Sequence, residues 1–338
     1  MGGVFTISLD FELHWGVFDK RNREERRGVY DTTVAVVPRM LELFEKSGVH
    51  VTWATVGSMF ARNRAQWEQL KPSILPKYTT EKYSAYRYID ENGLNEESYF
   101  AHFAPDVIKM IKNYRGQEIG THTFSHYYCL EEQHEPGAFE ADLRAAVKTA
   151  AAAGVSLRSL VFPRNQFNPD TLKTCYDLGI TAVRSNPDTW FWNPVKDKGS
   201  SLVRKIIRSS DAYIQLGDKR TSYHLSTIAN SPGLPLCLPS SRFLRPWNPQ
   251  YQFANGLRIN RINNEIKAAA KNNECYHLWW HPENFGTFAD KNIESLRRIL
   301  KTFEYCRERY NMKSWNMGEY AGNLNGTVKT ASHATVHL

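Results

Sequence analysis

The first clear pattern in the chain is an alternation of large apolar residues with small or polar ones. It runs from Val4 to Glu12 and ends in two carboxylates, Asp10 and Glu12. Successive side chains of a strand point to opposite faces, so this stretch is predicted to be a strand with one apolar and one polar face. Both carboxylates fall on the polar face and meet where the strand ends. They mark either a strand end that reaches solvent or the start of a functional site.

The rest of the chain repeats the order strand, helix, strand, which is typical of a parallel sheet or barrel. Two stretches, 71–100 and 187–255, lack a clear period and are predicted to be insertions, the first as a structureless segment or lid. Residues 1–322 are predicted to form one domain, followed by a polar tail at 323–338. Further strands are predicted at 49–56, up to 120, and at 157–162, 181–184 and 275–280, and helices at 32–47, 105–113, 137–154, 169–178, 257–271 and 292–309.

Composition narrows the class of protein. The 338 residues are 41% hydrophobic and 23% charged, which is typical of a globular enzyme. We expect a cytoplasmic protein, because no run approaches the roughly 20 apolar residues of a membrane span, no signal segment is visible, and the five cysteines include no Cys-x-x-Cys pair. The net charge of +8 includes a basic run at 20–27, either a solvated loop or a contact for an anionic substrate. No nucleic-acid reader motif is present.

A histidine pair follows the strand that reaches Gly120. His122 and His126 are four residues apart, so on one helical turn they would share a face and could bind one metal ion. A chain with 11 histidines can contain such a pair by chance. A functional role is favoured by its position, because the pair, like Asp10 and Glu12, lies at a strand end. Two histidines and one carboxylate form a metal-binding set that leaves positions open for water and substrate.

Two other predicted strands also end in side chains capable of chemistry. Arg164 follows the strand at 157–162, and His281 follows the strand at 275–280. Singly, such an arginine is usually a surface ion-pair residue and such a histidine a packed ring. Four strand ends carrying such groups together favour a site of the kind that barrel enzymes assemble.

This order of motifs resembles the metal-dependent polysaccharide deacetylases of carbohydrate esterase family four, over about residues 4–281. The segment Thr121–His126 is the most specific match, and the apolar strand 51–57 is similar to one in these enzymes. The resemblance implies an α/β fold, a distorted and incomplete (β/α) barrel of about seven strands in a single domain. Departures from the family motifs, together with the lack of a visible signal segment, predict a divergent, intracellular member of the family.

The resemblance also implies roles for individual residues. Asp10 becomes the catalytic base, although the family's two aspartates are adjacent and here the acids are separated by Phe11. Arg164 becomes the residue that orients Asp10, although it follows Pro163 rather than preceding a proline. The general acid is His281, with His277 as the alternative on the same face. The remaining implied roles are metal binding by Glu12, His122 and His126, and substrate contacts by Asp188, Trp190, Trp279 and Trp280.

The implied reaction is hydrolysis of an N-acetyl group on an amino sugar with one divalent metal ion, zinc, or else cobalt, nickel or manganese. We expect the substrate to be a nucleotide- or lipid-linked intermediate of bacterial surface-glycan synthesis, of the capsule or O-antigen type. Two alternatives stay open: a hydrolase of the same fold that cleaves a small amide or ureide, and an inactive glycan-binding relative. The oligomeric state is not predicted.

Overall fold

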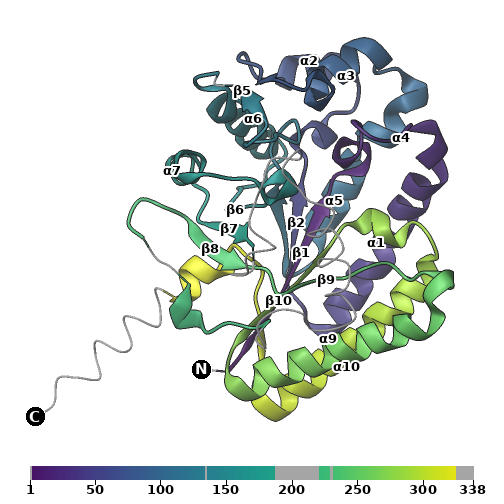
Figure 1. Cartoon of the computed structure of the whole chain (residues 1–338), viewed down its shortest axis with the longest axis vertical. Helices are drawn as coiled ribbons and strands as arrows, with labels where there is room; N and C mark the ends of the chain where they lie inside the picture. Colours follow the sequence, from purple (N-terminus) through teal and green to yellow (C-terminus); the bar gives the residue numbers. More distant parts are fainter. Residues whose placement is uncertain (1, 134, 187–220, 229–230, 325–338) are drawn as a thin grey trace, which may run out of the picture.

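The centre of the molecule is a parallel sheet, seen in a computed structural model that describes residues 2–133, 135–186, 221–228 and 231–324 (Figure 1). Eight strands follow one another across the sheet, and a ninth, β11, pairs with the start of the first strand. In order across the sheet they are β8 (Leu236–Pro239), β7 (Ala182–Ser185), β6 (Ser159–Leu160), β4 (Gln117–Thr121), β2 (Val51–Thr55), β1 (Val4–Phe11), β10 (Cys275–Trp280) and β9 (Arg242–Phe243), with β11 (Lys313–Ser314) beside β1.

The two edges of this sheet are brought together by a very short connection. β8 and β9 lie at opposite ends of the strand order, yet only Ser240 and Ser241 separate them in the chain. The Ser240 N–H donates to the carbonyl of Ser185 on β7, and the Ser241 N–H donates to the carbonyl of His277 on β10. Two residues span less than about 11 Å, so the sheet must curl until its edges nearly meet. The predicted distorted, incomplete (β/α) barrel is confirmed.

Helices cover the outer face of the barrel, where the apolar face of β1 is buried. Phe5, Ile7, Leu9 and Phe11 are all buried in the main core cluster, as the alternation predicts. Three long helices lie on one side of the sheet in Figure 1, α1 (Arg27–Ser47), α9 (Gln252–Asn272) and α10 (Ala289–Tyr310). The shorter helices α5 (Pro105–Asn113), α6 (Ala138–Ala152) and α7 (Pro169–Asp177) connect the other strands. None of the described helices is both long and apolar enough to cross a bilayer.

The inner face of β1 carries polar side chains that bond across the barrel. Thr6 is hydrogen-bonded to the Tyr320 hydroxyl at 2.7 Å, and Ser8 to His277 Nε2 at 2.8 Å. Below them Val4 belongs to a smaller apolar cluster that closes the amino-terminal end of the barrel. Polar groups are therefore concentrated toward the carboxyl ends of the strands, where parallel barrels place their sites.

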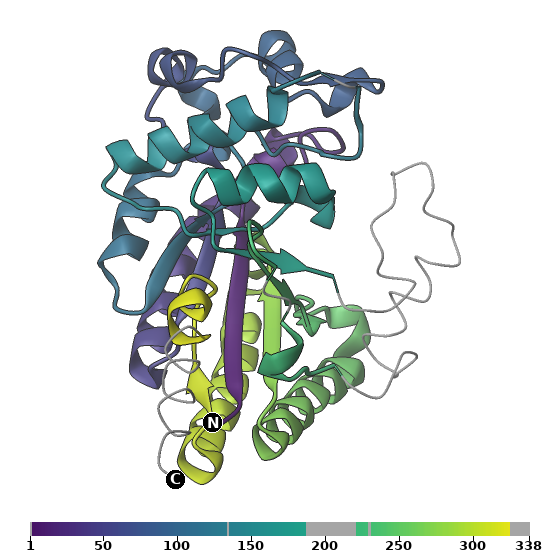
Figure 2. The same cartoon turned by 90° about the vertical axis from the view of Figure 1, so that its left-hand side faces the viewer.

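Residues 71–100 are regular and packed, which corrects the prediction of a structureless segment. With α2 (Arg64–Leu70) they form the end of the molecule beyond the carboxyl end of β1 (Figure 2). Tyr78, Tyr83, Tyr86 and Tyr88 are buried against other aromatic rings. The elements are too short to show a helical period in sequence. They are β3 (Lys77–Tyr78), which pairs with β5 (Glu132–Gln133), and the helices α3 (Ala85–Asn92) and α4 (Tyr99–His102).

Candidate active site

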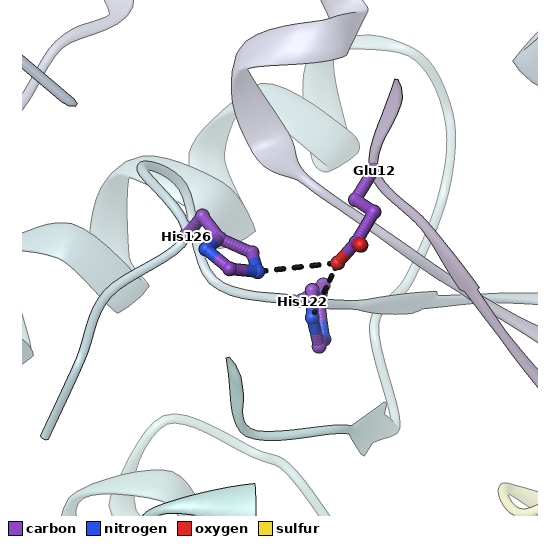
Figure 3. A group of neighbouring side chains, drawn as sticks. All are labelled: Glu12, His122 and His126. Carbon is purple, nitrogen blue, oxygen red and sulfur yellow. Dashed lines mark hydrogen bonds and ion pairs between the residues drawn. The ribbon is translucent and has the colours of Figure 1, made fainter. Parts of the chain in front are cut away.

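Three side chains from the ends of β1 and β4, the two strands on either side of β2, converge on one point (Figure 3). Glu12 follows β1, while His122 and His126 follow β4. The Glu12 Oε2 atom lies 3.3 Å from His122 Nε2 and 3.1 Å from His126 Nε2. All three residues are buried. Burial works against the Glu12 carboxylate, but His281 and the two imidazoles outweigh it and hold the pKa of Glu12 well below its usual value.

The ring orientation of His122 suits a metal ligand. Its Nδ1 lies 2.7 Å from the backbone carbonyl of Val161, which can only accept, so Nδ1 carries the hydrogen. This leaves the Nε2 lone pair directed at Glu12, the arrangement that orients histidine ligands in metal sites. Two imidazole nitrogens and one carboxylate oxygen form a donor set that fits zinc and other divalent first-row metal ions.

The histidine pair lies on a loop, not on the predicted helical turn. Thr123 and His126 have φ angles of +64° and +59°, in the left-handed region. The loop is held by Asp142 of α6, whose carboxylate accepts hydrogen bonds from the N–H groups of Phe124 at 2.7 Å and Ser125 at 3.2 Å, and from the Ser125 hydroxyl. Asp142 is fully buried, and burial raises its pKa to about 6. It is a positioning residue that the sequence analysis missed.

Asp10 forms a buried ion pair with Arg184 at the end of β7. The two guanidinium nitrogens lie 2.6 Å and 2.7 Å from the two carboxylate oxygens, and the Arg184 side chain is only 1% exposed. Arg184 also donates to Asn165 Oδ1 at 3.2 Å and lies over the Trp279 ring at 4.1 Å. Burial opposes ionisation of Asp10, but the charge of Arg184 outweighs it, so the pKa of Asp10 is lowered.

His281 lies between the two acids at the exposed side of the cluster. Its Nε2 is 3.7 Å from Asp10 Oδ2 and 3.6 Å from Glu12 Oε1, and its side chain is 30% exposed. His277, the alternative acid, is fully buried with Nε2 bonded to Ser8. Burial and the charge of Arg184 lower the pKa of His277 to about 3, so this ring is neutral near pH 7.

Glu283 holds the turn that presents Glu12. Its Oε1 accepts from the Leu13 N–H at 2.5 Å and from the Glu12 N–H at 3.3 Å. These bonds stabilise Leu13 in a left-handed conformation, with φ of +46°. Burial and the charge of Glu12 raise the pKa of Glu283 to about 8. Glu283 is a second positioning residue that the sequence analysis did not assign.

Comparison with known proteins matches part of the chain, which includes His122 and His126, to one family model. Residues 27–183 match the family model described as polysaccharide deacetylase. No curated protein sequence matches the chain significantly. The matched segment covers a little under half of the chain. The predicted resemblance is confirmed.

Solved structures share the barrel at low sequence identity. A protein from Mycobacterium smegmatis classed as a polysaccharide deacetylase is 14% identical, with a TM-score of 0.60 over 96% of this chain and 91% of that one. A protein of the same class from Pseudomonas aeruginosa PAO1 is 12% identical, with a TM-score of 0.55 over 94% and 89%. An allantoinase is also 12% identical, with a TM-score of 0.55 over 96% and 90%. At these identities the likeness concerns the fold.

Arg164 does not have the position expected from the deacetylase resemblance. It forms an ion pair with Asp19 at 2.7 Å, and its guanidinium lies over the rings of Tyr128 and Tyr83. The prediction that Arg164 orients Asp10 is therefore wrong, and Arg184 has that position. The physical reason is local: Arg164 itself has a φ of +56°, which turns the chain after Pro163 and directs this side chain toward the Tyr128 side of the site.

Of the residues predicted to contact substrate, Trp279 and Trp280 lie on opposite faces of β10. Trp279 lies on the inner face of β10, where its ring packs against Phe243 and His281. Trp280 points to the opposite face, is fully buried, and stacks on Phe285 in the core. The prediction of a substrate contact for Trp280 is wrong, because strand alternation directs it under the helices. Asp188 and Trp190 lie outside the described residues.

Proposed function

We propose that the protein is a metal-dependent hydrolase that removes an N-acetyl group from an amino sugar. The observation that carries the proposal is the grouping of one three-residue donor set with an acid and a base. Glu12, His122 and His126 form the donor set, and Asp10 and His281 lie beside it with 3.7 Å between the nearest carboxylate oxygen and Nε2. Metal-assisted amide hydrolysis uses each of these elements.

The metal ligands would be Glu12, His122 and His126, with zinc as the ion that best suits this donor set. A divalent ion held there supplies Lewis-acid polarisation of the amide carbonyl and makes a nearby water more acidic. Glu12 and the two imidazoles fix the position at which the acetyl group is bound. His122 keeps its ring orientation through the bond from Nδ1 to the Val161 carbonyl.

Asp10 is the proposed general base. Its carboxylate accepts the proton of the attacking water, and the bidentate pair with Arg184 keeps it ionised and fixes its orientation. His281 is the proposed general acid. From the exposed side of the cluster its Nε2–H can donate a proton to the amide nitrogen as the C–N bond breaks, so that the sugar leaves as a neutral amine and not as a strongly basic anion.

An amino sugar is favoured over a small amide by the groove that adjoins His281. The groove has a volume of about 780 Å³ and is lined by four aromatic residues, Phe243, Trp247, Tyr251 and Phe288. Flat apolar rings of this kind pack well against sugar rings. A cytoplasmic, carrier-linked intermediate of surface-glycan synthesis is the proposed biological substrate, supported by the basic residues of the same groove.

The test is acetate release from a panel of N-acetylated mono- and disaccharides. The small-amide controls are acetamide, also followed by acetate release, and allantoin, followed by formation of allantoate. We expect chelator-sensitive release from sugars in the wild type and none in Glu12→Gln. Turnover of allantoin or acetamide without turnover of any sugar would replace the proposal with a small-amide hydrolase. Binding of sugars with no turnover by the zinc-loaded protein would replace it with a glycan-binding protein.

A further inference from the structure

A groove beside the catalytic cluster has aromatic walls that begin at the proposed acid. The Phe243 ring packs against the His281 ring with centroids 5.6 Å apart. Further along, Trp247 and Phe288 pack edge to face at 4.9 Å, and Phe288 is 46% exposed. A glycan whose N-acetyl sugar occupies the catalytic cluster would therefore place its next unit in this groove.

Among the described residues that line the groove, basic side chains outnumber acidic ones. Three arginines line it, Arg26, Arg245 and Arg258, and Glu283 is the acidic residue of the lining. The guanidinium of Arg26 is fixed, because its Nε donates to the Tyr30 hydroxyl at 3.2 Å. A half-buried arginine such as Arg26, beside a low-dielectric wall, attracts an anionic group and binds it with charge-assisted hydrogen bonds.

Glu283 provides a second, independent observation at the same groove. Its Oε1 is occupied by the Leu13 and Glu12 N–H groups, whereas its Oε2 is buried and, within the described part of the chain, has no hydrogen-bond partner. A buried polar atom without a partner is costly, so it favours a ligand that pairs with it. A sugar hydroxyl both donates and accepts, and it can therefore bond to Oε2 in either protonation state of the carboxyl group.

We propose that this groove binds an anionic unit joined directly to the N-acetyl sugar, with the ring on the aromatic wall, a hydroxyl on Glu283 and the anion on Arg26. The inference rests on the proposed function and adds a substrate class to it. The shared chemistry is a negative charge next to the N-acetyl sugar. It can come from the carboxylate of a neighbouring uronic acid or from the phosphate of a carrier.

Binding of three probes by calorimetry tests the proposal. The probes are a neutral N-acetylglucosamine disaccharide, a disaccharide of a uronic acid and N-acetylglucosamine, and nucleoside-diphosphate-linked N-acetylglucosamine. We expect at least one anionic probe to bind about tenfold more tightly than the neutral disaccharide at low salt. This preference is expected to shrink at high salt. The probe that gains the preference identifies the source of the charge.

Variants of Arg26 assign the preference to the groove. Arg26→Met is expected to remove most of the preference, and Arg26→Lys to keep part of it, since lysine retains the charge but not the planar fork. Arg144→Met is the matched control, because Arg144 is a 63% exposed arginine of α6 that pairs with Glu140 away from the groove. Equal affinity for neutral and anionic probes, or a preference that Arg144→Met reduces as much as Arg26→Met, would overturn the inference.

Acetate release measured on the same samples separates the two claims. Release from neutral and anionic probes alike, with no effect of Arg26→Met, overturns the anionic groove and leaves the deacetylase in place. Charge-selective binding that depends on Arg26, without acetate release, supports the groove and overturns the deacetylase.

Discussion

Replacing Arg184 with methionine removes the guanidinium that faces Asp10 and leaves a carboxylate in a buried position. The two side chains are 1% and 4% exposed, so water screens the pair very little. Removing one partner of such a pair costs about 3–5 kcal/mol of folding free energy. Burial then favours the protonated form of Asp10, which can no longer accept a proton. Loss of a general base lowers kcat by about 10² to 10⁴-fold, so we expect a fall of at least 10²-fold.

The assay is acetate release at saturating substrate, with urea unfolding measured on the same preparations. Arg184→Lys serves as the conservative variant. It keeps a charge but not the bidentate geometry, and we expect it to recover part of the lost activity. Arg164→Met is the matched control, because Arg164 pairs with Asp19 rather than Asp10, and its kcat is expected to fall less than about fivefold. A large loss in Arg164→Met beside a nearly active Arg184→Met would refute the assignment.

Three further predictions concern single positions. Burial raises the folded-state pKa of Asp142 from 3.8 to about 6. Protonation of Asp142 therefore stabilises the folded wild type below pH 4, and about 3 kcal/mol of unfolding free energy is lost as pH rises through 6. In Asp142→Asn this loss is absent. Urea unfolding of both proteins between pH 4 and pH 7 measures it, and a difference in unfolding free energy that stays the same at every pH would contradict the prediction. Trp280→Ala is expected to lower the unfolding free energy by about 3–5 kcal/mol, whereas Trp279→Ala mainly raises KM. Steady-state kinetics and denaturation check this pair, and a Trp280→Ala protein of wild-type stability would contradict it. His281→Gln is expected to slow release from N-acetyl sugars by about 10²-fold or more but to affect an aryl acetate far less, because a phenolate leaves without a proton; equal losses on both substrates would exclude the acid role.

The barrel could be predicted because strand alternation and parallel order are local signals. The apolar face of β1 is buried as its sequence pattern implies, and Asp10 and Glu12 share the inner edge. The strands β8 and β9 could not be separated from their surroundings, because they are only four and two residues long within a stretch rich in proline and serine. Their role in closing the sheet depends on long-range pairing, which no local pattern reveals.

The arginine was misassigned because the prediction relied on order along the chain. Arg184 also lies at the end of a predicted strand, so the strand-end criterion applied to Asp10 and His281 could have identified it. Asp142 offered a weaker signal, a lone acid on the buried face of an alanine-rich helix. Asp142 can hold the His122 loop only because α6 packs against that loop, and the sequence does not specify this packing.

Reconstitution of metal-free protein tests the metal-dependent deacetylase most directly. Protein stripped by a chelator is titrated with zinc while bound metal and acetate release are measured together, beside His126→Ala. We expect activity to rise in proportion to bound zinc and to reach its maximum at one ion per chain, with weak binding and no activity in the variant. Full activity in the stripped protein, or one tightly bound zinc ion in His126→Ala, would contradict the proposed centre.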